Sequence, residues 1–305
     1  MEGIKILGKF ILVDFSYTLH RYHYGFREHF VKKGEDNVFV GSLKGFCFLV
    51  ERLYKKYPEH KIVFVLDGKC SKKELDEDYK ANREKDKTEI YVDTNHIINI
   101  LSNLGHVAFA KNDGVEADDL IASIAYDLKD RGNEEIIIYS GDKDFYQLSE
   151  DFKVANDYDK GFKFVDNNLV FSKFGVATSN LLSFRVLDGD KSDNLKAPVA
   201  FVKTEFKRLF AEAWYPTTAE KFLETVDSFK GTKWEATSKK YLDVIDVVDS
   251  YREIMDLGKY SDKENRLDYR LFKTTPDKDL IQYYELRQFE VFLYDYLKKE
   301  SKISA

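Results

Sequence analysis

Nine acidic side chains, spread over five short segments of the sequence, have the types and spacing that could do chemistry. They are Asp14, Asp67, Glu116, Asp118, Asp119, Asp142, Asp144, Asp190 and Asp193. Taken singly, each has a simpler explanation, because an aspartate often ends a strand, caps a helix or occupies an Asp-Gly turn. Three acids within the four positions 116–119 exceed what capping one helix requires.

Carboxylates that share a cleft need cations, because neighbouring negative charges oppose one another's ionisation. Mg²⁺ prefers oxygen ligands, keeps several waters and pairs with phosphate groups. Two such ions can activate a water and stabilise the leaving oxygen of a phosphodiester. The six histidines lie outside the acidic segments, and two cysteines alone build neither a zinc site nor a disulfide framework. The sequence therefore predicts a hard-cation site and hydrolysis of phosphodiesters.

The acids follow apolar runs that read as strands buried on both faces. These runs cover residues 10–13, 62–66, 106–110 and 136–139. Helices are predicted between them, over 40–57, 91–104 and 117–131, because apolar residues recur there at helical spacing and each stretch stops at a glycine or before a proline. The alternation predicts an α/β fold, a mostly parallel central sheet flanked by helices. In such sheets ligands bind at the carboxyl ends of the strands, where Asp14, Asp67 and Asp142 fall.

The second half of the chain reads differently. Residues 154–165 read as a hairpin around Asp159-Lys160-Gly161. From about residue 168 the chain looks helical, most clearly over 241–257 and 279–299.

Composition restricts the class of protein without deciding it. The 305 residues fit one large domain, or one domain with an appended lobe. The net charge is −6, yet setting aside the nine acids leaves 45 acidic against 48 basic residues, so any basic surface for nucleic acid must be local. No apolar run approaches the ~20 residues of a membrane span, no signal peptide is recognisable, and the low cysteine content suits a reducing compartment, so we expect a cytoplasmic protein without a membrane partner.

Six segments, taken in order, resemble the successive motifs of the 5′-3′ exonuclease and flap endonuclease family, which has a PIN-like fold. They are Val13-Asp14-Phe15-Ser16, Asp67-Gly68-Lys69, Tyr79-Lys80-Ala81-Asn82-Arg83, the run from Gly114 to Asp119, the run from Ser140 to Leu148, and the run from Gly189 to Asn194. The family includes the 5′ nuclease domain of bacterial DNA polymerase I and phage flap endonucleases. The length, the helical tail and a diverged region after Asp193 make the chain most similar to the ribonuclease H branch of T-even-like phages. The resemblance implies a catalytic α/β nuclease domain over 1–167 with a helical arch at about 69–90, and a helical DNA-binding lobe over 168–305.

The resemblance also implies a role for each matching residue. Asp14, Asp67, Glu116, Asp118 and Asp119 would hold or surround a first Mg²⁺, Asp142 and Asp144 would bridge towards a second, and Asp190 and Asp193 would complete the second site. Mn²⁺ is expected to substitute for Mg²⁺. Lys80 would contact the scissile phosphate, Arg83 would offer a fork to phosphate, and Tyr79 could stack on a 5′ base. The residues expected to be catalytic are thus Lys80, Arg83 and Asp142.

The region after Asp193 departs from the family pattern. Many members carry a glycine-rich helix-hairpin-helix there, which grips duplex phosphates with backbone amides and a monovalent cation. Residues 195–204 lack those glycines, and Pro198 removes an amide donor, so no K⁺ is expected. Side chains would hold the duplex instead. The candidates are Lys196, Lys203, Lys207 and Arg208.

By this resemblance the function is two-metal hydrolysis at 5′ ends, flaps, nicks, gaps and RNA-DNA hybrids, which would remove RNA primers during lagging-strand synthesis. The enzyme would be a monomer, in the host cytoplasm if phage-encoded, with a single-stranded DNA-binding protein or a sliding clamp as a partner. Two alternatives remain open. One is a single-strand-specific PIN-like ribonuclease, against which the nine acids and the segment at 79–83 argue. The other is a catalytically dead nucleic-acid-binding scaffold, against which the complete set of motif acids argues.

Overall fold

The computed structural model describes residues 8–69, 72, 75–76, 78–81, 88–156, 162–198, 230–232, 235–236, 239, 243 and 245–303. The chain forms two compact units. Unit 1 comprises residues 1–69, 85–141 and 260–305, and unit 2 comprises residues 70–84 and 142–259. These units do not follow the boundary near residue 167 expected from the sequence, because the last part of the chain packs with the first.

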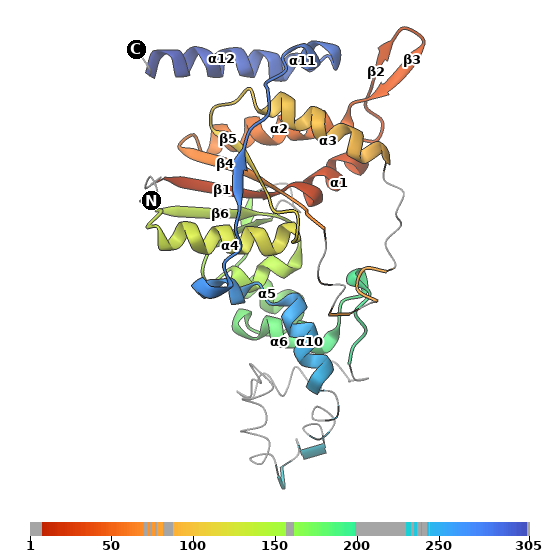
Figure 1. Cartoon of the computed structure of the whole chain (residues 1–305), viewed down its shortest axis with the longest axis vertical. Helices are drawn as coiled ribbons and strands as arrows, with labels where there is room; N and C mark the ends of the chain where they lie inside the picture. The colour runs from red at the N-terminus through yellow and green to blue at the C-terminus, as the bar shows by residue number, and fades with distance from the viewer. Residues whose placement is uncertain are drawn as a thin grey trace. The chain divides into compact units, whose positions relative to one another are not determined.

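Unit 1 contains a mostly parallel sheet, as predicted. Its strands lie in the order β6-β1-β4-β5-β9. Their bounds are Lys9–Asp14 (β1), His60–Leu66 (β4), Val107–Lys111 (β5), Glu135–Tyr139 (β6) and Arg270–Phe272 (β9). β6, β1, β4 and β5 run parallel side by side (Figure 1), with Ile11 opposite both Ile62 and Ile137. The central side chains of these strands are almost completely buried, which explains their continuous apolar sequence.

Helices cover both faces of this sheet. They are α1 (Phe15–Gly25), α2 (Gly41–Lys56), α3 (Thr88–Leu101) and α4 (Ala117–Asp130). Side chains alternate between the faces of a strand. The ring of Phe64 packs against Phe15 of α1 and Phe46 of α2, whereas its neighbour Val63 lines a cavity on the other face with Leu128 of α4. The three helices predicted in this half of the chain are therefore confirmed, with their ends shifted by a few residues.

Three features of unit 1 differ from the sequence-based expectation. A hairpin of β2 (Phe30–Lys33) and β3 (Asp36–Phe39) was not predicted. The helix predicted over 279–299 is two helices, α11 (Asp279–Tyr283) and α12 (Arg287–Ile303), because Glu285 adopts a left-handed conformation with φ of 54° and ends the first. β9 lies in a region expected to be helical and pairs antiparallel with β5, which places the end of the chain in unit 1.

Unit 2 is built from short elements. The predicted hairpin is confirmed as the antiparallel pair β7 (Lys153–Asn156) and β8 (Lys163–Phe164), although its predicted turn at 159–161 lies outside the described residues. The helices α5 (Asn167–Phe174), α6 (Leu181–Asp188) and α10 (Ile245–Met255) accompany the 3-10 turns η2 (Lys143–Leu148) and η4 (Lys191–Asp193). Gln147 joins η2 to the end of α10, since its side chain donates to the carbonyl of Met255 over 3.0 Å and accepts from the N–H of Leu257 over 3.0 Å.

Among the described residues, no helix has the length and apolar character needed to cross a membrane.

Candidate metal centre

Five of the nine predicted ligands lie in unit 1, at the carboxyl ends of its parallel strands. Asp14 is the last residue of β1, Asp67 follows β4, and Glu116, Asp118 and Asp119 begin α4.

Asp14 is fixed from two sides. Its Oδ1 accepts a hydrogen bond from the N–H of Tyr17 over 3.0 Å and caps α1, so the simple explanation from capping is correct for this oxygen. Its Oδ2 accepts from the hydroxyl of Ser140, just after β6, over 3.1 Å. The side chain is 8% exposed, so a buried carboxylate joins the ends of two neighbouring strands.

Asp67 is tied to the start of α4. Its Oδ1 accepts from the N–H of Ala117 over 2.7 Å. The next residue, Gly68, donates to the carbonyl of Val115 over 2.8 Å, and a Cβ at this position would lie 2.0 Å from the carbonyl oxygen of Asn112. The Asp-Gly pair therefore does more than turn the chain, because the missing side chain lets strand β4 end against the loop that precedes α4.

Three acids at the start of α4 form the first trio. Glu116, Asp118 and Asp119 each offer one carboxylate oxygen, and these oxygens lie within 4.8 Å of one another. Glu116 is 7% exposed and Asp119 3% exposed, so water screens their charges little. The helix N-terminus favours negative charge there, but by a small amount compared with the mutual repulsion of two buried carboxylates and the half-buried Asp118. The trio therefore has the donor set and spacing to hold a divalent cation.

A glycine fixes the last strand end of unit 1. A Cβ at Gly141 would lie 1.9 Å from the phenol oxygen of Tyr17. Tyr17 belongs to α1, and its backbone N–H is the donor to Asp14. Glycine at this position thus allows the chain after β6 to pass close to α1 and brings Ser140 to Asp14.

Unit 2 holds the other four predicted ligands, three of which form a second trio. Asp142 is exposed and caps η2, accepting from the N–H of Asp144 over 3.0 Å. Asp144, Asp190 and Asp193 each offer one carboxylate oxygen, and these also lie within 4.8 Å of one another. The structure thus assembles six of the nine acids into two trios, one in each unit.

The loop that carries Asp190 and Asp193 has a fixed backbone. Asp190 and Leu195 exchange two N–H···O=C hydrogen bonds of 2.8 Å. Gly189 adopts φ of +72°, and a Cβ there would lie 2.6 Å from the backbone N of Ala197 and the carbonyl oxygen of Leu195. The glycine of this Gly-Asp motif is therefore required for the loop to close on itself.

The predicted phosphate-binding segment is attached to the second trio. The N–H of Lys80 donates to the carbonyl of Asp193 over 2.8 Å, and the Asn194 side chain donates to the carbonyl of Asp78 over 2.9 Å. The phenol of Tyr79 donates to Oδ2 of Asp193 over 3.3 Å. Tyr79 is 1% exposed, so its ring is buried in this structure and its phenol contacts a carboxylate, while its stacking on a 5′ base stays a prediction.

Sequence reasoning missed Arg185. Its Nη2 donates to both Asp144 and Asp190, and its side chain is 13% exposed. Burial works against the charge of Arg185, but the two carboxylates outweigh it and its pKa is raised. Burial also works against the charge of Asp190, but the Ser192 hydroxyl and Arg185 lower its pKa. The signal was one arginine in the otherwise uncharged stretch 181–187, five positions before Asp190.

Four predicted substrate-binding residues cannot be placed. Arg83, Lys203, Lys207 and Arg208 lie outside the described residues, as do residues 82–87 of the predicted arch. Lys196 is exposed, and its role stays a prediction.

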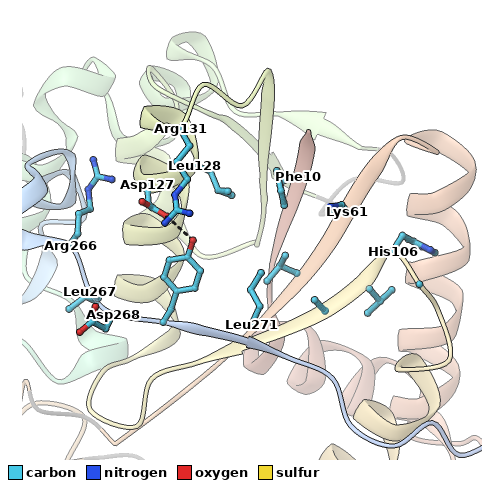
Figure 2. A pocket seen from close by; sticks show the side chains of 15 residues that line it. Phe10, Lys61, His106, Asp127, Leu128, Arg131, Arg266, Leu267, Asp268 and Leu271 are labelled. Carbon is cyan, nitrogen blue, oxygen red and sulfur yellow. Dashed lines mark hydrogen bonds and ion pairs between the residues drawn. The ribbon is translucent and has the colours of Figure 1, made fainter. Parts of the chain in front are cut away.

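A cavity of about 560 Å³ in unit 1 lies away from the acids, at the opposite ends of the strands (Figure 2). Phe10 and Lys61, from the beginnings of β1 and β4, line it together with α4. Charged side chains that line the cavity form ion pairs and hydrogen bonds with neighbouring residues of the same lining. Asp127 lies 2.8 Å from Nη2 of Arg131 and accepts from the hydroxyl of Tyr269 over 2.7 Å, the contact drawn as a dashed line in Figure 2. This cavity is therefore not the candidate metal centre.

Comparison with known proteins agrees with this fold. Residues 9–175 match the family model described as 5′-3′ exonuclease, N-terminal resolvase-like domain. A 5′-3′ exonuclease of Buchnera aphidicola is 28% identical over 199 residues, which cover 64% of this chain and 67% of that protein. The DNA polymerase I of Pseudomonas aeruginosa is 30% identical over 187 residues, 61% of this chain but 20% of the polymerase. The solved structure of the bacteriophage T5 flap endonuclease in a pseudo-enzyme-product complex with DNA and metal ions has a TM-score of 0.62, with 15% identity, and covers 95% of this chain and 98% of that one.

A mostly parallel sheet with acidic clusters at the carboxyl ends of its strands, together with these likenesses, defines the class of PIN-like 5′ nucleases. The family model matches more than half of the 305 residues, and the chain therefore belongs to the 5′-3′ exonuclease family.

Proposed function

We propose that this nuclease uses two divalent metal ions, Mg²⁺ in the cell, to hydrolyse phosphodiesters at 5′ ends, flaps, nicks and gaps and in RNA-DNA hybrids. The observation that carries the proposal is the pair of acidic trios, Glu116 with Asp118 and Asp119, and Asp144 with Asp190 and Asp193. Their all-oxygen donor sets suit Mg²⁺ or Mn²⁺ and offer no sulfur or imidazole to softer metals. The related phage T5 flap endonuclease, solved with DNA and metal ions, supports the same substrate class.

The chain's own residues would have two roles, to hold the metal ions and to contact the substrate phosphate. The first trio, with Asp14 and Asp67 beside it in unit 1, would hold one ion, and the second trio with Asp142 would hold the other. Bound ions would supply an activated water and stabilise charge on the leaving oxygen. Lys80, whose backbone is fixed by Asp193, would place its ammonium against the scissile phosphate and stabilise the charge that develops there. Arg83 would offer a second cationic contact to phosphate.

We infer further that the biological substrate is the 5′ end of a lagging-strand segment, from which RNA primers and adjoining DNA are removed. The similarity to DNA polymerase I supports a place in DNA replication. A monomer acting in the cytoplasm, assisted by a single-stranded DNA-binding protein or a sliding clamp, is the simplest arrangement for this role.

The decisive experiment is a Mg²⁺ titration against labelled flap, nick, gap and RNA-DNA hybrid substrates, with the product lengths as readout. We expect cleavage from the 5′ side that requires Mg²⁺ or Mn²⁺ and stops in excess chelator. Activity that persists in chelator would exclude the metal mechanism. Preference for an unstructured RNA over a flap would favour the single-strand ribonuclease, and binding without cleavage would favour the inactive scaffold.

A matched pair of variants separates metal binding from capping. Asp142 caps η2, and Asp166 caps α5 in the same way, accepting from the N–H of Leu169 over 2.8 Å, but Asp166 belongs to no acidic cluster described above. Asp142→Asn should abolish hydrolysis while the substrate still binds, and Asp166→Asn should keep near-normal rates. Equal rates in the two variants would remove Asp142 from the site.

A further inference from the structure

One nitrogen of Arg185 lies between two carboxylates of the second trio. Nη2 donates to Oδ1 of Asp144 and to Oδ2 of Asp190, and all three side chains are no more than 15% exposed. A divalent cation that bound Oδ1 of Asp144 together with Oδ2 of Asp190 would approach the same pair of oxygens as the guanidinium. The guanidinium therefore occupies the place that the trio offers to an ion.

The other oxygen of Asp190 is already engaged. Oδ1 accepts from the N–H of Ser192 over 2.8 Å and from its hydroxyl over 2.5 Å. These two bonds hold the carboxylate in place without Arg185, so the arginine is not needed to fix its orientation. An ion at Oδ2 of Asp190 would compete with Arg185 and leave Ser192 where it is.

We propose that Arg185 is the resident counter-ion of this trio: it neutralises Asp144 and Asp190 before a divalent ion arrives, and it releases at least one of them to a substrate phosphate, so that tight metal binding at the trio depends on substrate. This inference rests on the proposed metal-dependent function. It assigns to Arg185 a positioning role, because the arginine acts through the carboxylates that hold the ion.

Charge balance supports the dependence on substrate. The three carboxylates of the trio and one guanidinium carry a net charge of −2, and a divalent ion brings these four groups to zero, while the neighbouring Asp142 adds one further negative charge. A phosphate that enters then meets a cation and a guanidinium, and a planar guanidinium forms strong paired hydrogen bonds with phosphate as readily as with carboxylate. Without Arg185 the empty trio would carry −3 and attract an ion more strongly in the absence of DNA. Because coupling between two ligands is reciprocal, the phosphate that strengthens ion binding is itself bound more tightly when the ion is present.

The test is a Mn²⁺ titration of the full chain, followed by the electron paramagnetic resonance of free Mn²⁺, with and without a nicked duplex carrying an uncleavable phosphorothioate. The wild type should bind its weaker Mn²⁺ about tenfold more tightly with the duplex than without it, a coupling of ordinary size. Arg185→Gln should bind that ion about tenfold more tightly than the wild type in the absence of DNA, and should lose most of the gain that DNA brings.

Arg252→Gln is the matched control. Arg252 is an arginine of unit 2 that donates to the hydroxyl of Ser183 over 3.1 Å, on the helix that carries Arg185, and it belongs to neither trio. Its replacement should leave Mn²⁺ binding within about threefold of the wild type, because its hydrogen bond goes to a hydroxyl group and not to the carboxylates that Arg185 joins.

Three results would overturn the inference: unchanged or weaker Mn²⁺ binding by Arg185→Gln without DNA, an equal effect of Arg252→Gln, or no effect of the duplex on the wild type. The effect of the duplex on Mn²⁺ binding by the wild type tests the inference even where Arg185→Gln does not fold. These outcomes differ from a failure of the proposed function, which would appear as no Mn²⁺ binding and no metal-dependent cleavage by the wild type.

Discussion

The phenol of Tyr79 donates a hydrogen bond to Oδ2 of Asp193 over 3.3 Å, across 114 residues of sequence. The same aspartate accepts, through its carbonyl, the N–H of Lys80 over 2.8 Å. The predicted phosphate-binding segment at Tyr79 and Lys80 and the second acidic trio are therefore parts of one local structure in unit 2. A substitution in either one should alter the position of the other.

Tyr79→Phe tests whether this contact positions Asp193. Loss of one hydrogen bond to a carboxylate at this length should cost about 1 kcal/mol, which corresponds to a roughly fivefold fall in the cleavage rate and a higher Mg²⁺ requirement. The measurement is the rate at saturating DNA as a function of Mg²⁺ concentration. If Tyr79 instead stacked on a base, Tyr79→Phe would cleave at the wild-type rate. Only Tyr79→Ala would then weaken DNA binding.

Lys80→Ala tests the proposed phosphate contact. The ammonium lies 4.8 Å from the centre of the Tyr79 ring, whose phenol donates to Asp193 of the second trio. Loss of one preorganised cation at a developing charge should lower the single-turnover rate by about 10²-fold. Lys61→Ala is the control, because Lys61 is exposed at the beginning of β4, away from the strand ends that carry the acids. Similar rates for the two variants would remove Lys80 from the chemistry.

The local features of the sequence predicted unit 1 well. Buried parallel strands are continuous apolar runs, so β1, β4, β5 and β6 were visible with their acids at the ends. The short strand β9 was not visible, because Arg270 and Leu271 are largely exposed and only pairing with β5 makes the segment a strand. The break between α11 and α12 was hidden for a related reason: apolar residues continue at helical spacing through Glu285, whose positive φ depends on its surroundings.

The acids of the site could be predicted, but their supporting contacts could not. The sequence shows that Asp144 and Asp190 each follow a glycine closely. It does not show that the side chain of Arg185, in the last turn of α6, lies between their carboxylates. It places Tyr79 beside Lys80 and therefore suggests two residues that face the substrate. The structure buries one of them, because consecutive side chains in a turn point in different directions.

Gly141→Ala tests the close approach of β6 to α1. The new Cβ would lie 1.9 Å from the phenol oxygen of Tyr17, so the backbone or the ring must move, and overpacking of this kind costs about 1–3 kcal/mol of unfolding free energy. Tyr17→Leu in the same chain should recover part of the loss, which a double-mutant cycle in urea would measure. Gly114→Ala is the control, because its Cβ would meet nothing closer than Asn112 Oδ1 at 3.5 Å. A loss in Gly141→Ala no larger than in this control would contradict the steric argument.

The last prediction concerns His106, whose ring lies between those of Tyr54 and Tyr296, with centroids 4.8 and 4.9 Å away. Burial, with a smaller contribution from the charge of Lys273, lowers the pKa of His106 from 6.5 to about 4. Between these values the unfolded chain binds a proton at His106 that the folded protein does not. The stabilisation is complete above about pH 6.5 and is lost as the pH falls towards 4, by about 2–3 kcal/mol at pH 4.5. His106→Phe keeps an aromatic ring in this place and should lose less stability than the wild type between pH 7 and 4.5, by about that amount, in urea unfolding. The control is His29→Phe, which replaces an exposed histidine and should show the same pH dependence of the unfolding free energy as the wild type. If the unfolding free energies of the wild type and His106→Phe changed in parallel with pH, His106 would be protonated as readily in the folded protein as in the unfolded chain.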